Sequence, residues 1–429
     1  WGTPLPIWAN DETNEYKCIG SIAELEQLTG AKVTDLHREN IDHLTFTVDG
    51  EPGTYRRIEE VLDCWFESGS MPYAHLHYPF ENQAHFDKGF PAEFIAEGLD
   101  QTRGWFYTLI VLGNALFGTN AFNNVIVNGI VEAEDGKKMS KRLRNYTPPD
   151  DLMEQYGADA LRLYLINSGL VKAEEQRFSD AGVKDMTRRA LLPWLNAYRF
   201  LKTYASIDAW TPPAESKQSL NIMDQWILSR LQSLKARISE EMDQYHLYDV
   251  VPALFDFIED LTNWYIRLNR SRFWDTHLSE DKQNAFQTLH TTLYEFSICM
   301  APFAPFLAET IFAGLPKQPG TPESVHLCRY PKADPTLIEP LLEQAVERMQ
   351  HIILLGRQKR NQEKVKTKYP LRKLTVVHKE RLLLDEISRL ESYLLAELNV
   401  KEIGYHDAEE DYITLFARPN SPVLGRRLG

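Results

Sequence analysis

The sequence predicts an α/β domain, an all-α bundle and then a small α+β region. A strand–helix–strand spacing over 94–127 indicates the α/β part, strand signals nearly vanish over 186–312, and a mixed pattern returns after about residue 340. A chain of 429 residues exceeds what one core usually covers, so we expect several domains. We expect these domains at residues 1–60, 61–185, 186–340 and 341–429.

Residues 1–60 predict a small connective insertion rather than a free-standing core. A short strand-like run at 44–48 is followed by turn residues at 49–53. The one helical stretch in this segment, 22–28, is short.

The following segment predicts parallel strands with a crossover helix. Apolar residues at 94–96 and 125–127 predict two strands, and the residues from about 102 to 116 predict the helix between them. A loop over 135–144 follows the second strand, with Asp-Gly as its turn signal. A further helix starts near Asp150 and runs to about residue 164, with Gly157 as an interruption.

Long amphipathic runs then predict a helical bundle. They cover 223–244, 250–274 and 282–300, and proline-rich loops lie at 211–213 and 315–320. The tail predicts alternating helices and strands, namely helix 341–360, strand 374–377, helix 382–398 and strands near 400–405 and 412–416.

Composition excludes several classes of protein. A net charge of −14 disfavours a whole-surface nucleic-acid binder, so local basic clusters matter more than the total charge. The longest apolar stretch, 106–117, is too short to span a membrane and contains Gly113 and Asn114. The four cysteines lie far apart and form no Cys-x-x-Cys pair, so we expect no protein-bound zinc and a reducing, cytoplasmic setting.

The loop over 135–144 concentrates positive charge. Five cations lie within eight residues beside the glycine turn, and they are Lys137, Lys138, Lys141, Arg142 and Arg144. Mobile positive charge of this kind can stabilise a polyphosphate whose negative charge grows at the transition state. The alternative is a solvated basic loop.

The order of the residues narrows this choice. Lys138-Met139-Ser140-Lys141 after a parallel strand resembles the second signature of the class I aminoacyl-tRNA synthetases. Arg142 in place of the usual Ser, and Asn128-Gly129 in place of His-Gly, are similar to the eukaryotic-like branch of isoleucyl-tRNA synthetases. The resemblance to that family covers nearly the whole chain, and it is carried by the segments 1–8, 63–70, 97–106 and 263–274.

The resemblance implies a fold and an activity. The fold would be the second half of a Rossmann-like nucleotide-binding domain, an α-helical anticodon-binding bundle and the start of a small C-terminal α+β region. The activity would be ATP-dependent formation of isoleucyl-adenylate and transfer of isoleucine to tRNA(Ile). A valyl- or leucyl-type enzyme is the alternative within the class, and an autonomous tRNA-binding module is the alternative outside enzymes.

The resemblance also implies site residues. The catalytic set is Lys138, Met139, Ser140, Lys141 and Arg142. The substrate-binding set is Glu97 and Gly98 on the adenylate, Asp100 and Gln101 on its ribose and nearby polar groups, Trp65 and Trp105 around the isoleucine side chain, and Asn128 near the adenine or ribose. The alternative for the acids is a role at the helix N-terminus, because acids favour the first turn of a helix. The alternative for the two tryptophans is packing in the core, where indoles are usually found.

Partners follow from the same resemblance. ATP would bring Mg²⁺ with it, and the protein would be a cytoplasmic monomer without a membrane segment. The His-Ile-Gly-His signature and the editing insertion would precede Trp1. We therefore expect the chain to be a fragment that is inactive alone.

One segment of the bundle mixes cations with aromatic rings. Arg267, Arg270, Arg272 and Trp274 are candidates for tRNA phosphates and unstacked bases. The alternative is a core helix whose arginines pair with Glu259 or Asp260. A second basic stretch, from Arg357 to Lys373, is a candidate for tRNA phosphates or a solvated helix end.

Overall fold

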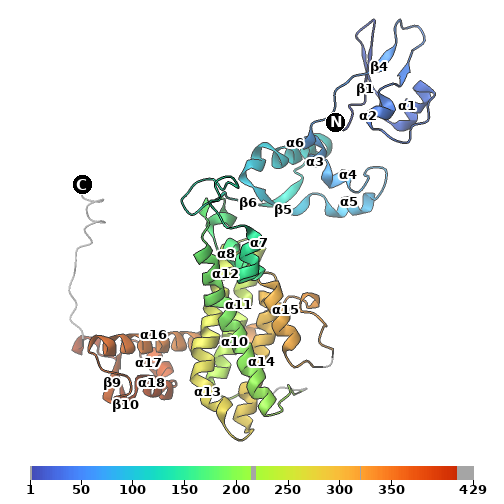
Figure 1. Ribbon diagram of the computed structural model, residues 1–429. Helices are drawn as coiled ribbons and strands as arrows, with labels where there is room; N and C mark the ends of the chain where they lie inside the picture. Colours follow the sequence, from blue (N-terminus) through green and yellow to red (C-terminus); the bar gives the residue numbers. More distant parts are fainter. Residues whose placement is uncertain (1, 214–218, 319, 413–429) are drawn as a thin grey trace, which may run out of the picture. The chain divides into compact units, whose positions relative to one another are not determined.

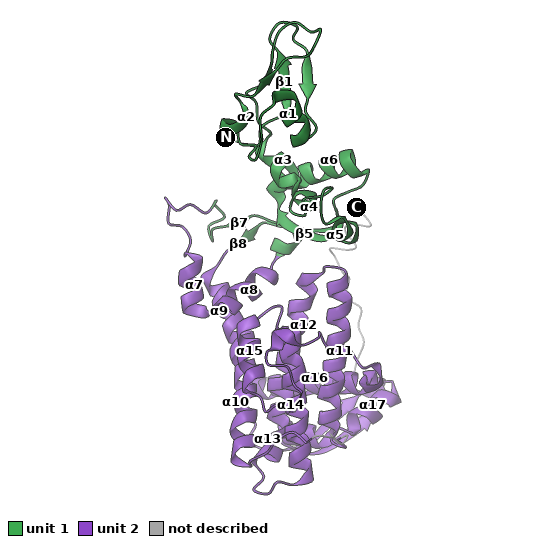
Figure 2. Cartoon of the chain, turned by 90° about the vertical axis from the view of Figure 1, so that its right-hand side faces the viewer, with its two compact units in different colours: residues 1–138, 169–177 green, residues 139–168, 178–429 purple. Residues whose placement is uncertain are grey.

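The computed structural model describes residues 2–213, 219–318 and 320–412 (Figure 1). The chain forms two compact units, which Figure 2 shows in different colours. The first unit contains residues 1–138 and 169–177, and the second contains 139–168 and 178–429. The chain therefore leaves the first unit directly after Lys138 and returns to it at Gly169.

The first unit begins with a four-stranded antiparallel sheet of order β2-β1-β4-β3. Trp8 and Tyr55 are 1% and 0% exposed, and the Trp8 indole donates to the Leu44 carbonyl at 3.0 Å. The prediction that this segment lacks a core of its own is wrong, because strands this short show no hydrophobic period although their side chains are buried. The elements are β1 (Ile7–Asn10), β2 (Tyr16–Cys18), α1 (Ile22–Thr29), α2 (Arg38–Ile41), β3 (Thr45–Phe46) and β4 (Tyr55–Arg57).

The predicted strand–helix–strand unit is confirmed. Strands β5 (Ala92–Gly98) and β6 (Phe122–Asn128) pair in parallel, and a 3₁₀ turn (Leu99–Arg103) and α6 (Trp105–Phe117) connect them. Ile95, Phe106 and Leu109 are buried between them. The unit also contains α3 (Cys64–Gly69), α4 (Met71–Ala74), α5 (Gln83–Gly89), a 3₁₀ turn (Gly169–Lys172) and the parallel pair β7 (Val131–Glu132) and β8 (Gln176–Arg177).

The second unit opens with the predicted interrupted helix. Helices α7 (Pro149–Tyr156) and α8 (Ala158–Ile166) are separated at Gly157, whose φ is +86°. Glycine adopts this backbone conformation at little cost, which explains the break. The buried Asp159 carboxylate accepts from the Phe306 and Leu307 amides, so α8 caps the N-terminus of α15 (Pro305–Gly314).

The predicted helical bundle is also confirmed. Between residues 186 and 312 the described part of the chain contains no strand. The predicted run 250–274 holds a π-helical turn, Asp260–Ile266, between two helices. The helices are α9 (Asp180–Met186), α10 (Leu192–Ile207), α11 (Ile222–Asp243), α12 (Leu247–Glu259), α13 (Arg267–Trp274), α14 (Glu280–Met300) and α15, and a second π-turn covers Thr187–Leu191.

The C-terminal part alternates helices with a parallel strand pair, as predicted. The predicted helix 382–398 consists of two helices, α17 (Arg381–Ser388) and α18 (Glu391–Leu398). The predicted strand near 412–416 lies outside the described residues apart from Tyr412. The remaining elements are α16 (Pro340–Gln362), β9 (Leu371–Val377) and its partner β10 (Val400–His406), with short 3₁₀ turns at Val325–Leu327, Pro335–Leu337 and Glu409–Asp411. None of the described helices is both long and apolar enough to cross a membrane.

Candidate functional site

The carboxyl ends of β5 and β6 bring the first candidate residues together. Gly98 is in register with Asn128, and Glu97 is in register with Val127. Ligands of parallel α/β sheets bind at this edge. A Cβ atom at position 98 would lie 2.6 Å from Asp100 Oδ1, so the glycine leaves room for that carboxylate beside the strand end.

Asp100 and Gln101 occupy the turn that leads from β5 into α6. The Gln101 Nε2 donates to Asp100 Oδ2 at 3.3 Å, and the Trp105 amide donates to Gln101 Oε1 at 2.9 Å. Gln101 therefore caps α6 and orients Asp100 at the same time. Glu97 and Asp100 are both exposed, so their carboxylates are accessible to a ligand.

The two candidate indoles lie close to one glycine. Trp105 follows Gly104 directly and donates its Nε1 hydrogen to the Ser68 carbonyl at 3.0 Å. A Cβ atom at Gly104 would lie 3.1 Å from the Trp65 ring. Trp65 is 41% exposed, so its ring is not a core residue and presents apolar surface.

The first half of the basic loop is a hairpin in the first unit. Lys138 bridges back to Glu132, the Ala133 amide donates to the Lys137 carbonyl at 2.8 Å, and Gly136 forms the turn with φ +74°. Asp135 accepts from the Lys137 amide, which lowers the pKa of that carboxyl below its usual range. Lys138 emerges from this hairpin with an exposed side chain.

The second half of the loop belongs to the second unit and turns around Ser140. The Ser140 amide donates to Asn145 Oδ1 at 3.0 Å, and its carbonyl accepts from the Arg144 amide at 3.0 Å. Met139 and Ser140 are half-buried, whereas Lys141 and Arg142 are exposed. The turn therefore presents the two cations to solvent and keeps the residues between the lysines packed.

Sequence reasoning missed the segment that packs beside Asn128. The Gly129 amide donates to the Leu170 carbonyl at 2.8 Å, and a Cβ atom at 129 would lie 1.8 Å from the Glu174 carbonyl oxygen. Residue 129 must therefore be glycine while this segment lies against it. The Asn-Gly pair was the available signal, because glycine in a strand end often marks a close backbone approach.

Among the tRNA candidates, Arg272 is held inside the bundle. Its guanidinium donates to both Asp224 carboxylate oxygens at 2.7 and 2.8 Å and to Asp281 at 2.7 Å. Asp224 is 0% exposed and also accepts from the Tyr265 hydroxyl at 2.8 Å. Burial, followed by the neighbouring Asp224 charge, raises the pKa of Tyr265 well above its usual value. These contacts give Arg272 a structural role.

The other candidates of this segment lie at the surface. Arg267 is exposed and pairs with Glu397 at 2.9 Å, and Arg270 is exposed. Trp274 is 55% exposed, as expected for a ring able to stack on a base. In the alternative interpretation these arginines would pair with Glu259 or Asp260, but Asp260 accepts from Arg230 at 3.0 Å.

The basic stretch from Arg357 to Lys373, which begins in the last turns of α16, divides in the same way. Arg360 is buried and donates to backbone carbonyls of Tyr369, Leu398 and Asn399, so it fixes the end of α16. Lys359 forms an exposed ion pair with Glu363 at 2.6 Å. The exposed cations in the rest of this stretch are Lys364, Lys366, Lys368, Arg372 and Lys373.

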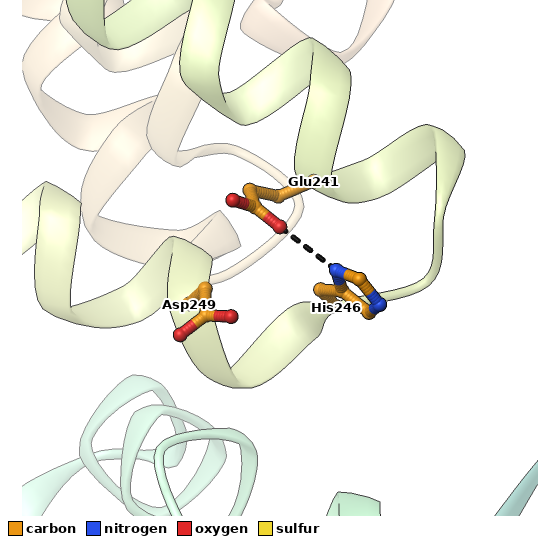
Figure 3. Close-up of side chains that lie close together, drawn as sticks. All are labelled: Glu241, His246 and Asp249. Atoms are coloured by element: carbon orange, nitrogen blue, oxygen red, sulfur yellow. Dashed lines mark hydrogen bonds and ion pairs between the residues drawn. The ribbon is translucent and has the colours of Figure 1, made fainter.

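One group of potential metal ligands lies between α11 and α12 (Figure 3). The His246 Nδ1 lies 2.9 Å from a Glu241 carboxylate oxygen, and Asp249 completes the group. The three ligand atoms lie within 4.8 Å of one another. Structural zinc sites take four protein ligands, and the described residues supply three here.

Two family models match parts of the chain. Residues 1–177 match the family model of the class I tRNA synthetases (I, L, M and V), and residues 224–376 match the anticodon-binding domain of tRNA ligase. These two segments are therefore similar to the catalytic and anticodon-binding parts of tRNA synthetases of class I.

Within that class the chain is homologous over its whole length to isoleucine–tRNA ligases. It is 51% identical to the ligase of Bdellovibrio bacteriovorus, and 48% and 47% identical to the cytoplasmic ligases of Saccharomyces cerevisiae and Mus musculus. These matches cover 100% of the chain, which in turn spans 41%, 41% and 35% of the three relatives. The predicted family is confirmed.

Two solved structures share the fold. A ternary complex of Agrobacterium radiobacter K84 agnB2 LeuRS with tRNA and LeuAMS superposes with a TM-score of 0.57 at 19% identity, covering 79% of this chain and 42% of that one. Mycobacterium tuberculosis methionyl-tRNA synthetase with methionyl-adenylate gives a TM-score of 0.51 at 18% identity, covering 69% and 57% of the two chains. The predicted fold class is confirmed.

Proposed function

We propose that the full-length gene product activates isoleucine with ATP as isoleucyl-adenylate and transfers it to tRNA(Ile). The observation that carries this proposal is identity of about 50% to isoleucine–tRNA ligases of three organisms along the entire chain. The chain spans about two fifths of those relatives, so the activity is proposed for the complete protein.

The edge formed by Gly98 and Asn128 would bind the adenylate. An Asp100 carboxylate accepts only, so it can take hydrogen bonds from both ribose hydroxyls, whereas an asparagine offers one accepting oxygen. Gln101 holds this carboxylate through the hydrogen bond at 3.3 Å. Glu97, exposed beside Gly98, would contact the aminoacyl end of the adenylate.

Trp65 and Trp105 would enclose the isoleucine side chain. Their positions around Gly104 supply flat apolar surface, and the Ser68 carbonyl occupies the one polar atom of the Trp105 ring. A branched aliphatic group gains from such walls because its burial removes apolar area from water.

The loop cations would stabilise negative charge on the phosphates. We assign this role to Lys138 and Lys141, with Arg142 as an additional cation, and we assign Met139 and Ser140 to the shape of the loop. The assignment to Lys141 rests on the signature and on its exposure within its own unit. ATP would carry Mg²⁺, and no protein-bound zinc is required in this part of the protein.

The anticodon-binding domain would contact tRNA through its exposed residues. Arg267, Arg270 and Trp274 remain candidates for direct contact, and Arg272 would support the segment from inside through Asp224. We also propose that the protein is a monomer and is cytoplasmic. The names of the yeast and mouse relatives, which include the word cytoplasmic, support the compartment.

The amino-acid-dependent exchange of pyrophosphate into ATP tests this function. The full-length gene product should catalyse it best with isoleucine when isoleucine, valine, leucine and methionine are compared. If valine or leucine drives the exchange best, that amino acid and not isoleucine is the substrate. If none of the amino acids drives exchange but the protein binds tRNA specifically, the result favours the tRNA-binding module.

A further inference from the structure

Glu132 of β7 has a cation on each side. Its backbone forms an antiparallel β-bridge with Lys138 across the hairpin, and it lies in register with Arg177 of β8 in the parallel strand pair. Residues that face one another across a sheet place their side chains on the same face. Lys138, Glu132 and Arg177 therefore alternate in charge along one face at the base of the loop.

The Arg177 guanidinium also lies on the turn of the hairpin. A Cβ atom at Gly136 would be 3.1 Å from Arg177 Nε and Nη2 and 3.2 Å from Cζ. The positive φ of Gly136, +74°, independently disfavours any other residue at this position. The missing side chain at position 136 thus provides the room in which the Arg177 head group lies.

The strand that carries Arg177 is itself anchored. The Gln176 amide donates to the Ile130 carbonyl at 2.9 Å, and the Gly129 amide donates to the Leu170 carbonyl at 2.8 Å. The close approach of Glu174 to Gly129 fixes the segment between these bonds. Arg177 therefore projects from a backbone that is tied to the end of β6.

We propose that Arg177 is a positioning residue for the basic loop. Its head group holds the Gly136 turn, and its strand holds β7, so it sets the position of Lys138, to which β7 is bridged. The catalytic consequence rests on the proposed function, whereas the effect on the loop does not. No motif of the sequence identifies Arg177, because it lies in a two-residue strand that is separated from the basic loop in the sequence.

The test uses Arg177→Ala, Arg177→Lys and Gly136→Ala, alone and as an R177A/G136A double variant, in the full-length gene product. The matched control is Arg56→Ala, which removes an exposed arginine from β4 in the four-stranded sheet of the same unit. The readouts are kcat and KM of isoleucine-dependent pyrophosphate exchange, and the rate of tryptic cleavage within 137–144 under native conditions. Thermal unfolding of each variant reports whether it folds.

We expect R177A to lower kcat about tenfold or more with KM for isoleucine within about twofold, and to accelerate loop cleavage several-fold because cleavage follows local opening. R177K should restore part of the lost kcat and part of the resistance to loop cleavage. R56A should have the kcat and the cleavage rate of the wild-type protein. The effects of R177A and G136A should be less than additive, because the Cβ added at position 136 meets the Arg177 head group only while that side chain is present, whereas the cost of the positive φ remains in both backgrounds.

Wild-type kcat and wild-type loop cleavage in R177A would overturn the proposal, and so would fully additive effects of the two substitutions. If the wild-type protein shows no isoleucine-dependent exchange, the proposed function fails. The cleavage rates then decide whether Arg177 positions the loop.

Discussion

Arg272 shows how a side chain can suit nucleic-acid binding in the sequence and serve packing in the structure. Removing Arg272 would take away the cation that pairs with the fully buried Asp224 carboxylate, which would keep only the neutral Tyr265 and Ser219 hydroxyls as donors. Breaking a buried pair in this way costs about 3–5 kcal/mol. We therefore expect Arg272→Ala to lower the free energy of unfolding by that amount in urea denaturation of the chain.

Arg270→Ala is the matched control for this prediction. Arg270 is exposed on the same helix, and surface substitutions usually change stability by no more than about 0.5 kcal/mol. Equal stability of the two variants would contradict the structural role of Arg272.

Lys141 is the cation of the loop for which we expect the largest effect on catalysis. If its ammonium stabilises charge that develops on the phosphates, Lys141→Ala should slow isoleucine-dependent pyrophosphate exchange by about 10²-fold or more in the full-length gene product. Lys88→Ala on α5 removes an exposed lysine and should leave the rate within about twofold. An unchanged rate in K141A would refute the assigned role.

Helix α14 carries a histidine that links stability to pH. The buried His290 donates its Nε2 hydrogen to the Pro316 carbonyl at 2.8 Å, and burial lowers its pKa below the ordinary 6.5. Because the folded state disfavours the protonated ring, its contribution to stability is present above pH 6.5 and is lost as pH falls through the lowered pKa.

We therefore expect wild-type Tm to fall more between pH 7.5 and pH 5.5 than the Tm of His290→Gln, which keeps a hydrogen-bond donor but does not titrate. Melting curves at the two pH values measure this difference. Parallel losses of Tm in the two proteins would show that His290 is not the group responsible.

Element-scale prediction succeeded where the hydrophobic pattern is long. The helices over 223–244 and 282–300 have long amphipathic patterns, and the structure contains them. The parallel strands around Ile95 and Ile126 were predicted from short apolar runs on either side of a helical segment, and the structure contains them too. The π-turn within 260–266 and the break between α17 and α18 were missed, because neither interrupts the apolar pattern.

For the candidate site, local motifs identified candidate residues but not the contacts between distant segments. The signature around Lys138 and the resemblance identified candidates near the strand ends, and the register of Gly98 with Asn128 agrees with that choice of edge. The contact of Arg177 with Gly136 joins residues that lie far apart in the sequence and depends on three-dimensional proximity. No local spacing encodes such contacts.

The net charge of −14 disfavours tRNA binding by the surface as a whole, whereas the basic segment that follows α16 favours local binding of tRNA phosphates. Exposed Lys366 and Lys368 release counterions if they contact phosphates, so affinity should fall steeply with salt. Replacing both by alanine should weaken tRNA binding and reduce the salt slope by about one per lost contact in filter binding. Lys359→Ala, which removes an ion-paired lysine, is the control.

An unchanged affinity and salt slope in the double variant would exclude this stretch from the tRNA contact. Strong tRNA binding by the chain itself would show that it acts as a binding module without the rest of the protein.

We propose that the edge formed by Gly98 and Asn128 binds isoleucyl-adenylate together with Trp65 and Trp105. A crystal structure of the full-length gene product with a non-hydrolysable isoleucyl-adenylate analogue tests it most directly. We predict the ribose on Asp100 and the isoleucine side chain against the two indoles. An analogue bound away from these residues would refute this assignment of the binding site.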